Sequence, residues 1–253
     1  MIRRAVGKAI NRLLRPVGVE VRAIAPCSVV GDYKALTPSI VQKYLDSCNV
    51  RILQIATGPH YTQKCYHNWL NSDIANPPSW DHGVWSIFMD LQEDFLLPSN
   101  SFAYVFSQQG IEHFTYEQGA KILRECSRVL KPGGKMRIET PNLRYFIENY
   151  LGNDKPVGPS MAQFAKDFEA PPTHLTALNL IFLQWGHRYV YDVETLEELC
   201  RLCGFDKVHE VEMCKTDIAP FREALAFNPG SEADPFYKEH SFALEMEKSS
   251  RGS

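Results

Sequence analysis

Residues 51–59 read RILQIATGP and residues 128–138 read RVLKPGGKMRI, and these two stretches decide the fold class. In the first, an apolar run ends in a turn of small residues, which is typical of a buried strand that opens toward a ligand. In the second, the end of a helix passes through a Lys-Pro-Gly-Gly turn into another apolar run. Both stretches therefore predict strands of one sheet.

Strands and helices alternate between these stretches and beyond them. The sequence predicts seven strands, at residues 51–56, 69–74, 84–89, 102–107, 135–140, 206–213 and 241–247. It predicts helices at residues 38–47, 115–129 and 193–203, and Thr115 with Gln118 form a capping-box pattern at the start of the second. Such alternation indicates an α/β domain whose mainly parallel sheet is covered by helices on both faces.

Composition narrows the class of protein. The chain has 253 residues and a formal net charge of −3, which argues against general nucleic-acid binding. No apolar run reaches the roughly 18 residues of a membrane span, and no secretory signal is visible. The seven cysteines are scattered, which favours reduced thiols in a cytoplasm. Cys200 and Cys203 lie near the end of a predicted helix, where we expect buried thiols.

The two ends of the chain differ from the part between them. Residues 1–25 predict a basic amphipathic helix, in which Arg3, Arg4, Lys8, Arg12 and Arg15 lie among apolar residues at helical spacing. Such a helix can pack on the domain with its basic face in solvent, or lie on the anionic inner face of a membrane. Residues 249–253 read SSRGS and resemble a vector-derived tail, so the predicted domain spans residues 26–248.

Together with residues 102–114, FAYVFSQQGIEHF, the two opening stretches resemble the class I S-adenosylmethionine-dependent methyltransferases. The resemblance covers residues 50–215 and is closest to predicted methyltransferases of bacterial surface-polysaccharide and lipopolysaccharide synthesis. It implies a Rossmann-like sheet of seven strands, the last of them antiparallel, with S-adenosylmethionine as cofactor. Ala56 stands where the family usually has glycine, which is tolerable if its φ is negative, and Ala103 replaces the usual aspartate of the fourth strand.

The resemblance also implies a cofactor crevice at the strand ends. Asp73 matches the ribose position, where a carboxylate accepts two hydroxyl hydrogen bonds. Asp90 matches the position that accepts the adenine amine, and Leu91 would form a wall of the adenine slot. The expected cofactor-binding residues are Ile55, Ala56, Thr57, Gly58, Asp73, Ile74, Asp90, Leu91, Ser107 and Gln108.

His113 is the candidate general base, with Glu112 and His187 as further candidate catalytic residues. An imidazole with a pKa near about 6.5 suits the removal of a proton from a sugar hydroxyl. The alternative is that Glu112 and His113 only orient the loop.

The same three residues also resemble an element that holds a divalent metal in methyltransferases of small-RNA 3′ ends. Gln109 replaces an anionic ligand of that element, which leaves one carboxylate and two imidazoles. This set suits a transition metal better than Mg²⁺. The sequence favours a metal-free base and leaves the metal open.

Residues 141–191 interrupt the alternation with Pro156, Pro159, Pro171 and Pro172 and with an apolar run at residues 174–185. They follow the fifth strand, where an open sheet presents its ligand crevice, so we expect an inserted cap over the active site. The alternative is a packing decoration that touches no substrate.

We therefore expect an O-methyltransferase that acts on a sugar hydroxyl of a surface glycan, or of its nucleotide-sugar or glycolipid precursor. It would work in the cytoplasm or at the inner face of the membrane. Its partner would be a small-molecule or glycan acceptor, and the sequence leaves the oligomeric state open. The alternatives are another small metabolite or an RNA end as acceptor, and a catalytically inactive binding protein of the same fold.

Overall fold

The computed structural model describes residues 27–57, 68–74, 78–81, 84–152, 162–163, 165–166, 168–184, 186–226 and 235–250. The predicted N-terminal helix, Gly58 and the last three residues of the predicted tail lie outside these ranges. Within them, no helix combines the length and the apolar character needed to cross a bilayer.

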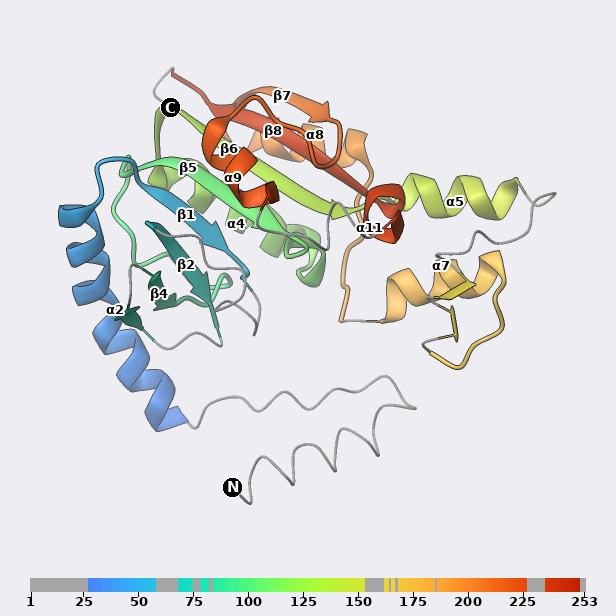
Figure 1. The fold of residues 1–253 in the computed structure, drawn as a ribbon, viewed down its shortest axis with the longest axis horizontal. Coiled ribbons are helices and arrows are strands. Elements are labelled where there is room, and N and C mark those ends of the chain that lie inside the picture. Colours follow the sequence, from blue (N-terminus) through green and yellow to red (C-terminus); the bar gives the residue numbers. More distant parts are fainter. Residues whose placement is uncertain are drawn as a thin grey trace.

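One mixed sheet of eight strands organises the part of the chain that the structure describes (Figure 1). Its strands are β1 (Ile52–Ile55), β2 (Trp69–Asp73), β3 (Ser79–Asp81), β4 (Val84–Phe88), β5 (Phe102–Gln108), β6 (Leu130–Pro141), β7 (Phe205–Val211) and β8 (Ser241–Lys248). They lie in the order β3-β4-β2-β1-β5-β6-β8-β7. β1, β2, β4, β5 and β6 pair in parallel, and the last strand, β8, is antiparallel to both of its neighbours. Seven of the strands are those predicted, which confirms the Rossmann-like class I methyltransferase fold.

Two strand predictions need correction. β3 was not predicted, because its three residues are too few to show an alternating pattern; it pairs antiparallel with β4 at the edge of the sheet. β6 begins at Leu130, not at the predicted residue 135, because Leu130 already pairs with Phe102 of β5, and the Lys-Pro-Gly-Gly segment forms an irregularity before pairing resumes at Lys135. Gly133 allows this course, since its φ of +73° is left-handed and strained for other residues.

Helices cover both faces of the sheet, as predicted. The larger core lies under α2 (Cys27–Ser47), α4 (Tyr116–Val129) and α8 (Val193–Leu202), and a smaller core lies under α9 (Ala219–Ala226). The capping box of α4 is confirmed, with Thr115 and Gln118 bonded reciprocally. The thiols of Cys200 and Cys203 are buried in the larger core, also as predicted.

The prediction of a helix start near Pro38 was wrong, because α2 begins at Cys27 and contains that proline. Proline lacks the N–H that would bond the carbonyl of Lys34 in the helical ladder, and the Thr37 hydroxyl donates separately to the carbonyl of Tyr33 at 2.9 Å. Val41 and Tyr44 are buried on the same helix, so packing against the sheet stabilises α2 despite the proline.

The predicted cap contains two helices, α5 (Leu143–Leu151) and α7 (His174–Leu183). They lie beyond the carboxyl end of β6, beside the short helix α11 (Pro235–His240) (Figure 1). The cap has its own small core, formed by Phe146, Ala165, Ala177, Leu180, Ile181 and Val190. It is therefore a packed unit at the carboxyl edge of the sheet, where a ligand crevice is expected.

Candidate active site

The strand ends bring most of the predicted cofactor positions to one edge. Ile55, the last residue of β1, pairs with Ser107 of β5, and both are buried. The backbone N–H of Thr57 donates to the carbonyl of Ser72 at 3.2 Å, which ties the turn after β1 to β2. Asp73 ends β2 with its side chain half-buried. The edge therefore presents a carboxylate and a hydroxyl beside a close backbone turn.

Ala56 departs from the expected backbone geometry. Its φ is +54°, in the left-handed region that favours glycine, and not the negative value that would make alanine tolerable there. The chain therefore keeps the turn of a glycine at this position while carrying a methyl group. Such strain is stored where the surrounding structure holds the backbone in place.

Three other predicted residues have surroundings that the sequence did not reveal. Leu91 is buried within the main core, so its side chain packs among core residues at the position of the predicted adenine wall. The side-chain amide of Gln108 donates to Glu139 at 2.9 Å within a buried network that includes Arg137. Ile74 is 52% exposed, at the opposite extreme from these buried residues.

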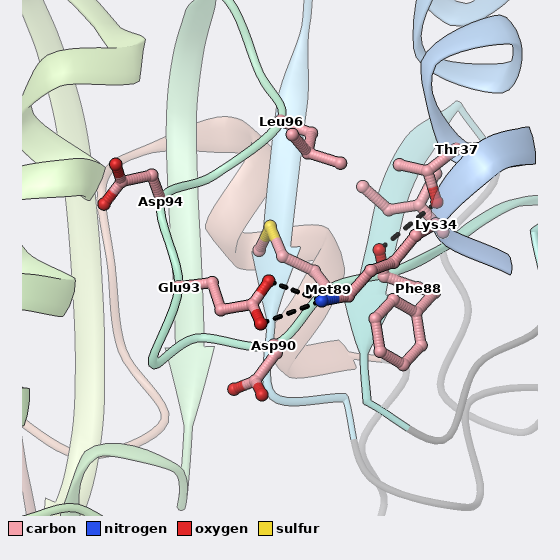
Figure 2. A pocket seen from close by; sticks show the side chains of 9 residues that line it. Lys34, Thr37, Phe88, Met89, Asp90, Glu93, Asp94 and Leu96 are labelled. Atoms are coloured by element: carbon pink, nitrogen blue, oxygen red, sulfur yellow. Dashed lines mark hydrogen bonds and ion pairs between the residues drawn. The ribbon is translucent and has the colours of Figure 1, made fainter. Parts of the chain in front are cut away.

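A hollow of about 300 Å³, partly open to solvent, lies between α2 and the segment after β4 (Figure 2). Lys34 of α2 forms an ion pair with Glu93 across it, at 2.7 Å. Asp90 lines the hollow with its carboxylate turned away from that pair, and this carboxylate accepts from the backbone of Gln92 at 2.9 Å. The sequence did not single out Lys34, because only the fold brings α2 to this position.

Glu112 and His113 lie on η2 (Ile111–His113), the single turn that follows β5. Glu112 is fully buried, and its Oε2 accepts a hydrogen bond from the Thr140 hydroxyl of β6 at 3.0 Å. Burial raises the pKa of its carboxyl to about 7. This carboxyl can therefore exchange a proton near neutral pH. The sequence missed Thr140, because only strand pairing brings it next to η2.

His187 comes from the end of the cap and meets His113 across the site. The centroids of the two imidazole rings are 5.1 Å apart, with the rings in an edge-to-face arrangement. His187 Nδ1 lies 2.6 Å from the carbonyl oxygen of Ile181, where it donates as the N–H tautomer. Burial lowers the pKa of His187, which favours the neutral imidazole.

Backbone contacts hold the cap segment on the site. The N–H groups of Arg188 and Tyr189 both donate to the carbonyl of Glu112, at 2.8 and 3.2 Å. One ligating atom from each of Glu112, His113 and His187 lies within 4.8 Å of the others. We call these three residues the Glu–His–His group. Gln109 takes no part in it, because its amide donates to the Ser241 hydroxyl at 3.0 Å.

Comparison with known families identifies part of this architecture. Residues 76–138 match the family model described as "Methyltransferase domain", a stretch that includes β3, β4, β5, η2 and α4. Residues 76–138 are therefore similar to a methyltransferase domain. With the observed sheet, this confirms the expected class of enzyme, an S-adenosylmethionine-dependent methyltransferase of class I fold. The match spans about a quarter of the chain, and the relation to enzymes of surface-polysaccharide synthesis stays a prediction.

Solved structures similar to this chain include proteins from Mesorhizobium loti, Archaeoglobus fulgidus and Haemonchus contortus. An S-adenosylmethionine-dependent methyltransferase from Mesorhizobium loti is 17% identical, with a TM-score of 0.46 over 86% of this chain and 99% of that one. One from Archaeoglobus fulgidus is 17% identical, with a TM-score of 0.45 over 86% and 96%. Phosphoethanolamine N-methyltransferase 2 from Haemonchus contortus is 14% identical, with a TM-score of 0.42 over 91% and 59%. These similarities are too distant to assign an acceptor, and no curated protein sequence matches the chain.

Proposed function

We propose that this domain transfers a methyl group from S-adenosylmethionine to an oxygen acceptor. The cofactor would lie along the ends of β1, β2 and β4, where Asp73 and Asp90 accept hydrogen bonds from its ribose and adenine. The acceptor oxygen forms a bond to the methyl carbon as the carbon–sulfur bond breaks, and S-adenosylhomocysteine leaves. Alignment of these atoms in one line can supply roughly 7–11 kcal/mol of the barrier reduction.

The Glu–His–His group is the observation that carries the choice of an oxygen acceptor. A hydroxyl must lose its proton as it is methylated, so a site for hydroxyls needs a group that handles protons. We assign proton removal to this group, and His113 is the side chain expected to act on the acceptor. The position of the group past the end of β5, in contact with the cap, supports this assignment.

We further propose that the acceptor is a sugar hydroxyl of a surface glycan, or of its nucleotide-sugar or lipid-linked precursor. The resemblance of residues 50–215 to methyltransferases of surface-polysaccharide synthesis supports this choice. Such an enzyme would work in the cytoplasm or at the inner face of the membrane, and the basic residues 1–25 would provide the membrane contact.

Two measurements test the proposal. Calorimetry with S-adenosylhomocysteine should give saturable heat, and no heat or thermal shift at millimolar ligand would leave only an inactive protein of the same fold. Release of S-adenosylhomocysteine from S-adenosylmethionine is then followed with nucleotide sugars, oligosaccharides, a quinol and a short RNA. Turnover with a sugar acceptor is expected, whereas turnover restricted to the quinol or the RNA would replace the proposed acceptor.

A further inference from the structure

We propose that the Glu–His–His group binds one divalent transition-metal ion. The group joins a carboxylate and two imidazoles from η2 and the cap, with ligating atoms within 4.8 Å of one another. Ligands to one such ion lie about 2.0–2.2 Å from it, so small side-chain rotations close the remaining distance. The catalytic meaning of the ion rests on the proposed function, but its binding does not.

The state of Glu112 is the second observation that points to a ligand. The residue is fully buried, and its Oε2 is held by Thr140. Its Oε1 has no hydrogen-bond partner among the residues that the structure describes. A buried carboxylate oxygen without a partner is costly and uncommon in native proteins. A cation shared with the two imidazoles would satisfy it.

Hydrogen bonds from neighbouring groups hold the candidate metal ligands in fixed orientations, as they do in known metal sites. His187 donates through Nδ1 to the carbonyl of Ile181, which fixes the tautomer and the orientation of the ring. The Thr140 hydroxyl fixes the other oxygen of Glu112. The cap segment is bonded to the backbone of Glu112, so the two parts of the site are held together. Carbonyl and hydroxyl groups of this kind are typical supports of metal ligands.

The ligand set decides which ions fit. Imidazole nitrogens suit zinc, copper, iron and nickel, whereas Mg²⁺ and Ca²⁺ prefer sites built from oxygens. Three protein ligands leave at least one coordination position open, as in catalytic metal sites. A Lewis acid at that position lowers the pKa of a hydroxyl that binds to it, so the proton can pass to solvent water. With the ion bound, His113 would act on the acceptor through the metal and not as a free base.

The test is metal binding by the full chain after removal of metals by chelation. Calorimetry with Zn²⁺, Co²⁺, Mn²⁺ and Mg²⁺ should show one site per chain for a transition metal and much weaker binding of Mg²⁺. The visible spectrum of the Co²⁺ form should indicate nitrogen and oxygen ligands, because thiolate ligands add intense near-ultraviolet absorption. Absence of transition-metal binding would overturn the proposal. So would a single bound ion whose spectrum shows thiolate ligands, because that ion would be held by cysteines and not by the Glu–His–His group.

Variants locate the site. Glu112→Gln and His187→Ala should each weaken metal binding at least about tenfold, and Thr140→Val should weaken it about 10–100-fold through Glu112. His209→Ala is the matched control, because this histidine is exposed on β7. Thermal melting shows whether each variant folds. If Glu112→Gln does not fold, His187→Ala still tests the site, because it changes only the cap segment. Wild-type metal affinity in a folded His187→Ala protein would overturn the proposal.

The proposed methyl transfer and the proposed metal site can be tested independently of each other. Metal binding without methyl transfer would keep the metal site and remove the assigned reaction. Full methyl transfer in the presence of a chelator, with no metal bound, would keep the reaction and remove the catalytic role of the ion, whereas the binding measurements alone decide whether the metal site exists. S-adenosylhomocysteine binding is measured on the same preparations and reports on the cofactor crevice alone.

Discussion

Ala56 and Gly110 meet where the turns after β1 and β5 touch, and their contact has room for a single Cβ atom. A Cβ built on Gly110 would lie 2.7 Å from the Cβ of Ala56 and 3.3 Å from the Ser107 hydroxyl oxygen. The strained turn at Ala56 is thus accommodated by a glycine on the opposite side of the contact. Both turns border the proposed cofactor crevice, so the shape of the crevice depends on this pair.

Ala56→Gly should raise the free energy of unfolding by about 1 kcal/mol, because glycine adopts a positive φ without the strain that alanine carries. Gly110→Ala should destabilise the protein by about 1–3 kcal/mol through overpacking. The double variant should recover much of that loss, since it removes the methyl group that clashes. Urea unfolding measures the stability of the two single variants and the double variant. If Gly110→Ala destabilises the protein equally with and without Ala56→Gly, the contact with Ser107 causes the loss.

Asp73→Ala should weaken binding of S-adenosylhomocysteine by about 1–3 kcal/mol, the scale for losing hydrogen bonds to a charged group. Calorimetry provides the measurement, and Asp206→Ala on the exposed part of β7 is the control. Unchanged affinity in a folded Asp73→Ala protein would remove this residue from the cofactor site.

His113→Ala should lower turnover by about 10²–10⁴ while the affinity for S-adenosylhomocysteine stays close to that of the wild type. The two effects separate because the proposed cofactor positions lie at the strand ends, whereas His113 lies on the turn beyond β5. Steady-state kinetics and calorimetry on one preparation check this. Turnover near the wild-type value, with methyl transfer shown to be rate-limiting, would make His113 a structural residue.

Acid should weaken the attachment of residues 95–99 to α4. Glu125 bonds to the guanidinium of Arg128 at 2.7 and 2.8 Å and accepts from the backbone of Phe95, and Arg128 donates to the carbonyl of Leu97. The hydrogen bonds from Arg128 lower the pKa of Glu125 below its ordinary value of 4.5. Because the folded state binds this proton less readily than the unfolded state, the stability from Glu125 is present above pH 4.5 and is lost as the pH falls through the lower folded-state pKa.

Glu125→Gln should therefore reduce stability at neutral pH and flatten the dependence of stability on pH below 4.5. Urea unfolding across this pH range measures both effects. Glu198→Gln is a matched control, because this exposed glutamate of α8 lies 3.8 Å from Arg201 in a surface ion pair, which contributes little. An identical pH profile in Glu125→Gln and wild type would contradict the assignment.

Deletion of residues 1–20 should leave the affinity for S-adenosylhomocysteine unchanged, because none of the expected crevice residues comes from this segment. If the segment contacts the membrane, the deletion should also reduce binding to anionic liposomes at low salt. Co-sedimentation at two salt concentrations measures this. Liposome binding that is unaltered by the deletion would remove the membrane role.

The sequence by itself determined the features that depend on neighbouring residues. Apolar runs of strand length, the Lys-Pro-Gly-Gly turn and the capping box at Thr115 predicted the main strands and α4, because period and turn chemistry are local properties. The order of strand-end motifs then predicted the class of enzyme. Glu112, His113 and His187 were recognised as residue types suited to proton or metal chemistry, but their mutual distances were not known.

Tertiary structure decided what depends on packing between distant segments. It brought His187 against His113, placed the Thr140 hydroxyl on Glu112, turned Gln109 toward Ser241 and set Ala56 at a positive φ. It also extended α2 through Pro38, against the local helix signal, because burial of that helix against the sheet outweighs the cost of a missing hydrogen bond. Burial and through-space distance have no signature in the local pattern of residues, and both decide the chemistry of the Glu–His–His group.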